Sequence, residues 1–185
     1  MKIIFIMFLI IISMNLRADD IQDLQIEGLS VGDSLLEYFD RSEIEKNKRN
    51  YLSGKRNFYA VGGGSLELKT YDNIDIYLKT DDNQFKIYMI SAFIFYEYDY
   101  NKCEDKQNEI VADIRNILTS SEIIESGDID HQYDKTGLSR RNHKTFLVNS
   151  DYLKIECLNW SDEIEKKHPT WTDHLSVSVI TSEIE

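Results

Sequence analysis

Proline, cysteine and long apolar runs are scarce in this 185-residue chain, and each shortage excludes a class of protein. Proline occurs once, and no Pro-, Gly- or Ser-rich linker divides the chain after residue 18. The two cysteines lack the C-x-x-C spacing of a zinc site. Gly62-Gly63-Gly64 lacks the Gly-Lys-Ser/Thr ending of a phosphate-binding loop, so we interpret it as a turn. The sequence therefore predicts no metal ion and no cofactor.

The longest apolar run, Ile3 to Ile12, has only ten residues, whereas a membrane-spanning helix needs about 20. It follows Lys2 and precedes a polar stretch ending at Ala18, the pattern of a secretory signal peptide. No cysteine precedes Cys103 that could carry a lipid. We predict a signal peptide over residues 1–18, cleavage after Ala18, and a periplasmic or secreted protein with no stable membrane anchor.

Export is testable by fractionating expressing cells and sequencing the N-terminus of the product. We expect a soluble form that begins at Asp19 or within a few residues of it, because signal peptidase cuts after a small residue. Recovery of the full-length chain from the membrane fraction would contradict the cleaved signal.

Acidic residues outnumber basic ones. Loss of Lys2 and Arg17 with the signal leaves 19 basic and 33 acidic residues, a net charge of −14. This charge opposes binding to nucleic acid or anionic membranes, because both would be repelled. The remaining 167 residues suit one domain with a sizeable core. We predict a single α+β domain over residues 19–185.

Hydrophobic periodicity predicts a mainly antiparallel sheet, with a meander followed by C-terminal strands. Alternation of apolar and polar residues, or a long apolar run, predicts strands over 66–69, 74–79, 85–96, 144–149, 152–158 and 174–181. Capping patterns predict short N-terminal helices, one after Ser34 and one over 42–48 with Ser42 as its cap. Helical spacing of apolar residues predicts a helix over 101–118 that packs on one face of the sheet. The polar stretch 119–142 is expected to be a loop.

The two cysteines are expected to pair. Cys103 falls on the apolar stripe of the predicted 101–118 helix, and Cys157 shares a strand face with Leu153 and Ile155. A helix packed on that face would bring the thiols together, and an exported chain is exposed to oxidation. We predict a Cys103–Cys157 disulfide; two separately buried thiols are the alternative.

The predicted 85–96 strand is apolar or aromatic on both faces, although a one-sided sheet needs only one. Two interpretations stay open. The N-terminal helices cover the second face, that of Tyr88, Ile90, Ala92, Ile94 and Tyr96, which we favour, or this face is a contact surface for a partner.

Gly32-Asp33-Ser34-Leu35 resembles the GDSL block of the SGNH serine esterases and lipases. The resemblance implies that Ser34 is a nucleophile served by a C-terminal histidine and carboxylate, for which His168 and Glu165 have the spacing. Glutamate replaces the family's aspartate, and the Gly-x-Asn-Asp block that supplies an oxyanion-hole asparagine has no counterpart. The alternation over 64–80 also differs from the continuous apolar strands of a parallel sheet. We therefore interpret Ser34 as a helix cap.

Residues 26–37 resemble the opening of small exported α+β proteins, including outer-membrane assembly lipoproteins and β-lactamase-inhibitor-like domains. In these, a glycine, a serine or threonine and a glutamate precede a capped helix, as Gly32, Ser34 and Glu37 do here. Together with the strand 155–160, the segment is also similar to uncharacterised exported proteins of low-GC marine bacteria. These resemblances imply location and fold but no activity.

Residues 128–136 alternate as calcium-loop ligands do, but Tyr133 stands where such loops have glycine and Ser139 where they have glutamate. Whether this acidic stretch binds calcium is left open. We predict a non-catalytic binding or interaction module with an unknown protein or small-molecule partner. The alternative is a GDSL-type serine esterase acting through Ser34.

Overall fold

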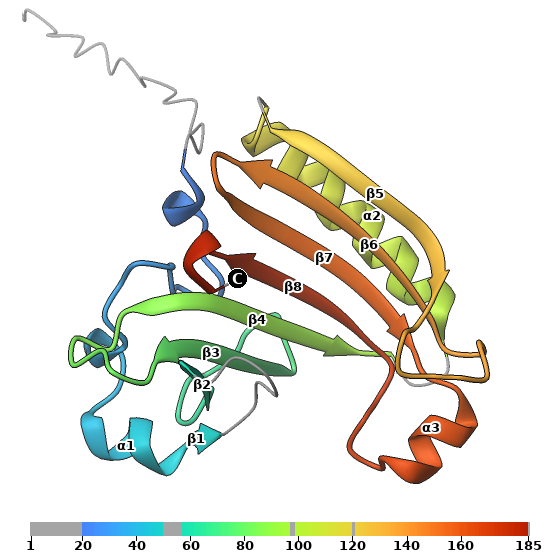
Figure 1. The fold of residues 1–185 in the computed structure, drawn as a ribbon. Coiled ribbons are helices and arrows are strands. Elements are labelled where there is room, and N and C mark those ends of the chain that lie inside the picture. Colours follow the sequence, from blue (N-terminus) through green and yellow to red (C-terminus); the bar gives the residue numbers. More distant parts are fainter. Residues whose placement is uncertain (1–19, 50–56, 97–98, 120, 185) are drawn as a thin grey trace, which may run out of the picture.

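The computed structural model describes residues 20–49, 57–96, 99–119 and 121–184, which form one antiparallel sheet of eight strands with helices on its margins and one face (Figure 1). The strands are β1 (Lys48–Arg49), β2 (Phe58–Gly62), β3 (Asn73–Lys79), β4 (Ile87–Phe95), β5 (Glu122–Asp130), β6 (Arg140–Val148), β7 (Asp151–Asn159) and β8 (His174–Ile180). The predicted α+β class is confirmed. The predicted signal peptide and its cleavage after Ala18 lie outside the described residues. Within the described ranges no helix is long and apolar enough to cross a membrane.

The sheet consists of two four-stranded halves. Its order is β1-β2-β3-β4-β8-β7-β6-β5, so two meanders meet through their last strands. The helices are α1 (Arg41–Lys46), α2 (Tyr100–Ile117) and α3 (Asp162–Lys167), with 3₁₀ turns η1 (Ile21–Asp23), η2 (Leu35–Glu37) and η3 (Ser182–Ile184). At the junction Ser91 pairs with Ser178, and their hydroxyl oxygens are 2.8 Å apart. In the chain, α1 precedes the first four-stranded half and α2 precedes the second.

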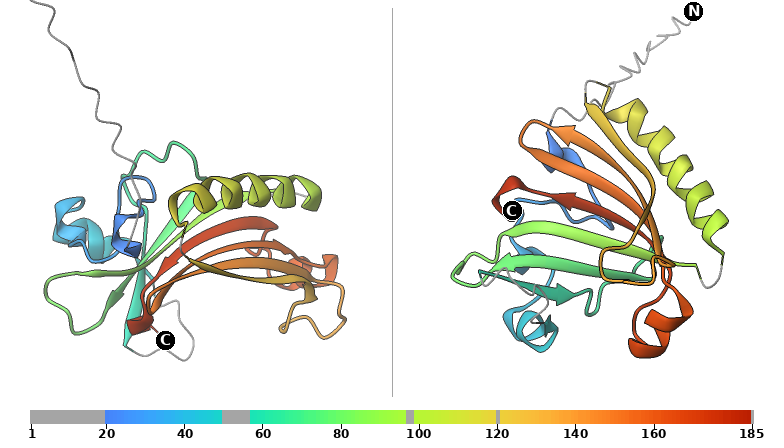
Figure 2. Two further views of the ribbon diagram at one scale, coloured as in Figure 1. Left: turned by 90° about the horizontal axis from the view of Figure 1, so that it is seen from above. Right: turned by 45° about the vertical axis from the view of Figure 1, so that its right-hand side comes forward.

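Helix α2 covers one face of the second half, as predicted (Figure 2). The Asp99 carboxylate caps its first turn, and the buried residues Cys103, Gln107 and Val111 recur every four positions toward the sheet. The Gln107 amide donates to the main-chain oxygens of Asn142 and Ile155, at 3.1 and 2.9 Å. The helix is therefore fixed to β6 and β7 by polar as well as apolar contacts.

The predicted Cys103–Cys157 disulfide is confirmed. The two Cα atoms are 5.9 Å apart, within the range that a disulfide spans. Both cysteines are buried. The bond joins the first turn of α2 to the end of β7 and therefore fixes which face of the sheet the helix occupies.

The N-terminal segments lie on the same face as α2 and cover the Ile90 and Ala92 face of the 85–96 strand, which confirms the favoured interpretation. Ile26, Leu29 and Leu35 belong to the same buried cluster as Val111 of α2. A β-bulge also exchanges the faces of the strand: Leu78 pairs with Ile87 and Tyr77 with Met89, so Tyr88 is the extra residue. The opposite face, which carries Met89, is closed only in part, by Ile184 and its neighbours.

Three predicted elements differ from the structure. Residues 63–72 form no strand, because the Glu27 carboxylate accepts the main-chain N–H groups of residues 69–71 in place of a neighbouring strand. Helix α1 is capped by Asp40 and not by Ser42, whose hydroxyl donates to Asp40. The expected loop over 119–142 contains β5 and the start of β6. The sequence of β5 does not alternate between apolar and polar residues, because β5 is an edge strand and has a bulge near Gly127, whose φ is 64°.

Candidate binding cleft

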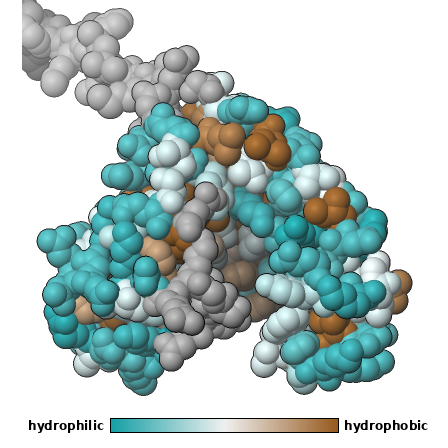
Figure 3. Space-filling view, in the orientation of Figure 1, coloured by the Kyte–Doolittle hydropathy of each residue, from teal (hydrophilic) through white to brown (hydrophobic). Residues whose placement is uncertain are grey.

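A cleft of about 590 Å³ opens on the face of the sheet away from α2. Figure 3 shows this face hollowed between the lobe that carries α1 and the lobe that carries α3. The lining residues are Arg49, Asn73, Asp75, Tyr77, Phe93, Phe95, His131, Tyr133, Trp160, Thr170, Trp171, Thr172 and His174. This size and this mixture of aromatic and polar groups are typical of ligand-binding sites.

The floor of the cleft comes from strand positions that share one face. Asn73 of β3 pairs with Phe93 of β4, and Phe95 pairs with His174 of β8. Because side chains alternate between faces, residues two apart on these strands all point into the cleft. The Phe93 and His174 rings meet edge to face, with centroids 5.3 Å apart. The sheet therefore supplies a rigid, half-aromatic floor.

One wall is a cluster of aromatic rings from three loops. Trp160 contacts His131 at 4.4 Å and Trp171 at 4.7 Å between ring centroids, and Tyr133 lies 6.4 Å from Trp171. His168 stacks on the other side of Trp171 at 4.2 Å. Tyr133 is 62% exposed. The wall presents both tryptophans of the chain to the cleft.

The buried carboxylate of Asp134 holds the loop that carries Tyr133. It accepts hydrogen bonds from the hydroxyls of Thr136 (2.7 Å), Ser139 (2.6 Å) and Ser161 (2.8 Å). These bonds, those of Ser139 above all, keep the pKa of Asp134 well below its ordinary value, so it stays ionised. Because Ser161 caps α3, one carboxylate connects the loop between β5 and β6 to the start of that helix.

Asp173 fixes the opposite end of the same wall. Its carboxylate accepts the Trp160 main-chain N–H at 2.6 Å and the Asn159 side-chain amide at 2.9 Å. Burial raises the pKa of Asp173 although both hydrogen bonds oppose this change. The end of β7 is thereby tied to the segment after Trp171. Two buried aspartates thus pre-organise the aromatic wall, which lowers the cost of ordering it on binding.

The facing wall carries an ion pair. Arg49 of β1 donates to Asp75 at 3.0 Å, and the guanidinium lies across Gly62, where an added Cβ would approach it to 2.6 Å. Asp75 is buried, and this burial raises its pKa although Arg49 works in the opposite direction. Arg49 is exposed. Its remaining donors can therefore meet a ligand without breaking the pair.

A second group of charges continues the face beyond the cleft. Glu156 of β7 lies within ion-pair distance of Arg141, His143 and Lys154, all on the same side of the sheet. Within the described residues, the buried Nε of Arg141 and Nδ1 of His143 make no hydrogen bond. These charges extend the polar part of the surface next to the aromatic wall.

Three histidines of this face favour their neutral form. Burial is the main cause that lowers the pKa of His131, His143 and His174, and nearby cations add to it for His131 and His143. His174 Nδ1 lies 2.7 Å from the main-chain oxygen of Thr172, so the neutral ring carries its proton there. The floor and wall are thus uncharged at these positions near pH 7.

We expect the free energy of unfolding to fall as the pH drops from 7.5 to about 5.5. The unfolded chain binds protons at its histidines near pH 6.5, whereas the folded chain, with lowered pKa values, does not until lower pH. Urea denaturation at both pH values measures the loss. His174→Asn should reduce this pH dependence, and an unchanged dependence would contradict the assignment.

The structure does not bring the predicted catalytic residues together. Ser34 bridges to Lys86 at the start of β4, and its hydroxyl donates to the main-chain oxygen of Gln84 at 2.6 Å while capping η2. His168 stacks on Trp171 near the other end of β4, a strand of nine residues that spans about 25 Å. Glu165 lies beside His168 in α3. The structure therefore does not pair Ser34 with His168 or Glu165, and Ser34 caps η2 as interpreted from the sequence.

The acidic residues of 128–136 are engaged with other side chains. Asp128 and Asp130 both pair with Arg140, and Asp134 accepts the hydroxyls described above. Across the described ranges no group of three or more His, Cys, Asp or Glu side chains is placed to hold a metal ion.

Sequence reasoning did not identify the residues of the cleft. The available signal was that the 85–96 strand is apolar or aromatic on both faces; Phe93 and Phe95 belong to the face opposite Ile90 and Ala92. The wall residues Tyr133, Trp160 and Trp171 come from loops that carry no recognisable motif.

Comparison with protein-family models, with curated proteins and with solved structures finds no match to this chain.

Proposed function

We propose that the protein is an exported, non-catalytic interaction module, located in the periplasm or secreted, whose aromatic cleft binds a protein partner. The observation that carries the proposal is the pre-organised wall of Trp160, Trp171 and Tyr133 facing the Arg49–Asp75 pair. Tryptophan, tyrosine and arginine dominate the energetics of protein interfaces, and fixed positions reduce the entropy lost on binding. The disulfide supports location in an oxidising compartment.

The openness of the cleft favours a protein over a small molecule. Tyr133 is 62% exposed and Phe95 is 43% exposed. A small-molecule site encloses most of its ligand, whereas these rings stand at the surface where a partner's side chain can pack against them. The charged residues Glu156, Arg141 and Lys154 next to the cleft then form a polar rim that can hydrogen-bond to the partner.

Affinity capture tests the proposal with variants that separate the cleft from the rest of the surface. The exported protein is immobilised and exposed to periplasmic extract and culture medium of the source cells. We expect a partner that is retained by wild type and by Leu138→Ala but lost with Tyr133→Ala. Leu138 is a matched control, because it is 66% exposed in the same loop but does not line the cleft. Equal retention by all three proteins would contradict the cleft as the binding site.

The non-catalytic part of the proposal has a separate test. Fluorophosphonate probes label serines that are activated by a base, and Ser34 donates to a main-chain oxygen instead. We expect no labelling of wild type and no difference between wild type and Ser34→Ala. Labelling that disappears in Ser34→Ala would establish the esterase alternative.

A further inference from the structure

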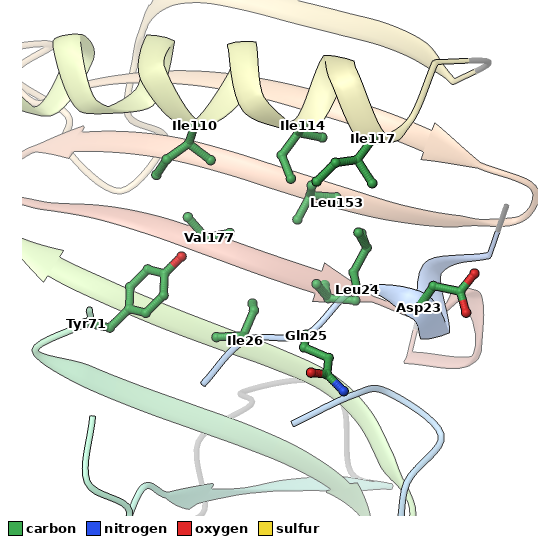
Figure 4. A pocket seen from close by; sticks show the side chains of 11 residues that line it. Asp23, Leu24, Gln25, Ile26, Tyr71, Ile110, Ile114, Ile117, Leu153 and Val177 are labelled. Atoms are coloured by element: carbon green, nitrogen blue, oxygen red, sulfur yellow. The ribbon is translucent and has the colours of Figure 1, made fainter. Parts of the chain in front are cut away.

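An aliphatic groove of about 500 Å³ lies on the other face of the sheet, between α2 and the N-terminal segment (Figure 4). The residues that line it are Asp23, Leu24, Gln25, Ile26, Tyr71, Ile110, Ile114, Ile117, Leu153, Val177 and Val179. Leu153, Val177 and Val179 form the floor from β7 and β8. The groove is separated from the aromatic cleft by the thickness of the sheet, so the two sites are independent.

The groove exists because α2 and the N-terminal segment cover different parts of the sheet. Helix α2 packs chiefly on β7, and the chain from Leu24 to Ile26 enters the core beside it. Ile110, Ile114 and Ile117 form a stripe along α2 that is only partly buried, and Ile117 is 36% exposed. At a rise of 1.5 Å per residue, this stripe extends for about 10 Å along the helix. Protein interiors are close-packed, so aliphatic side chains that border an open groove indicate a binding site for an apolar ligand.

Tyr71 places a single hydroxyl among these aliphatic side chains. Figure 4 shows its ring at one end of the groove with the oxygen directed toward Val177. Within the described part of the chain this hydroxyl makes no hydrogen bond, although the Tyr71 main-chain N–H donates to Glu27. Burial, and to a lesser degree Glu27, raises the pKa of Tyr71 to about 12, so the hydroxyl keeps its proton. The hydroxyl is therefore a donor at the edge of an apolar groove that a ligand acceptor can meet.

The charge at the rim restricts the head group of a ligand. Asp23 and Gln25 are the polar side chains there, and among the lining residues none is lysine or arginine. The Glu27 carboxylate lies close by, bound to the main chain of Tyr71. An anionic head group would be repelled by these carboxylates, whereas an uncharged one would not.

We propose that the groove binds an uncharged single-chain acyl lipid. The alkyl chain lies along Ile110, Ile114 and Ile117, and the acyl carbonyl oxygen accepts the Tyr71 hydroxyl. Purely aliphatic walls suit a flexible alkyl chain, and the single donor suits the single carbonyl of an acyl ester.

Titration of the exported protein with monolauroylglycerol, below its micelle concentration, tests the proposal. Isoleucine methyl NMR signals report on the groove directly. We expect saturable shifts of the Ile110, Ile114 and Ile117 methyls, and at least about tenfold weaker binding of lauric acid because of its carboxylate. Tyr71→Phe should weaken binding about three- to tenfold, the effect of one hydrogen bond.

Ile117→Glu should abolish the binding, because it puts a charge on the path of the alkyl chain. Ile124→Glu is its matched control: Ile124 is 47% exposed on the edge strand β5, away from the groove, and should leave binding unchanged. Absence of saturable binding, equal binding by Ile117→Glu, or lauric acid binding as tightly as the uncharged lipid would each overturn the proposal. Partner capture by Tyr133 variants is unaffected by any of these outcomes.

Discussion

Replacing Cys103 by serine is expected to lower the free energy of unfolding by about 4 kcal/mol, because the disulfide closes a loop between residues 54 apart in sequence. The closed loop contains β5, β6 and most of β7. The bond therefore restricts the conformations of the unfolded chain, which raises the free energy of the unfolded state relative to the folded one. Urea denaturation of protein purified from the periplasm measures the change. Both tryptophans lie at the cleft, and their emission reports the transition.

Reduction provides the control for this prediction. A reductant should destabilise wild type by a similar amount and leave Cys103→Ser unchanged, since the variant has no bond to lose. Cys157→Ser should resemble Cys103→Ser. Free thiols in oxidised wild-type protein, or a variant as stable as wild type, would mean that the bond does not connect α2 to β7.

Tyr133→Ala is expected to weaken binding of the captured partner by about 30-fold or more. Central aromatic residues of an interface typically contribute about 2 kcal/mol or more on truncation to alanine. Because Tyr133 is 62% exposed, its loss should change the free energy of unfolding by less than about 0.5 kcal/mol. Calorimetric titration of purified partner measures the first effect and urea denaturation the second.

The pair of measurements distinguishes a binding defect from a folding defect. Leu138→Ala should leave both quantities unchanged, since Leu138 does not line the cleft. Trp171→Ala should weaken binding as well, but it also removes contacts with Trp160 and His168 and is therefore a less clean test. If the partner bound Tyr133→Ala as tightly as wild type, Tyr133 of the aromatic wall would not be part of the interface.

The sequence predicted the elements that bury one face, because their apolar residues recur with the period of the helix or strand. The 101–118 helix and its disulfide follow from an apolar stripe that includes Cys103, and the structure agrees. Strand β5 could not be predicted in this way. It lies at the edge of the sheet, its carboxylates at Asp128 and Asp130 pair with Arg140, and it buries too little apolar surface to show alternation.

Long-range contacts decided the other differences. The alternation at Leu66 and Leu68 is typical of a strand. The main-chain N–H groups just after Leu68, however, donate to the carboxylate of Glu27, about 40 residues earlier, and not to a neighbouring strand. The bulge at Tyr88 moves residues of β4 to the opposite face from that expected by strict alternation. The cleft combines β1, β3, β4 and β8 with three loops, and no local pattern reveals such an assembly.

Site-specific photo-cross-linking in living cells tests the central claim, that the aromatic cleft is a protein-binding site, most directly. Tyr133 is replaced by p-benzoylphenylalanine, which keeps an aromatic ring at the cleft wall, and Leu138 is replaced in a parallel strain. Irradiation should yield one defined adduct of higher mass from position 133, in the exported fraction, and none from position 138. Adducts of equal yield from both positions, or none from position 133, would contradict a partner bound at this wall.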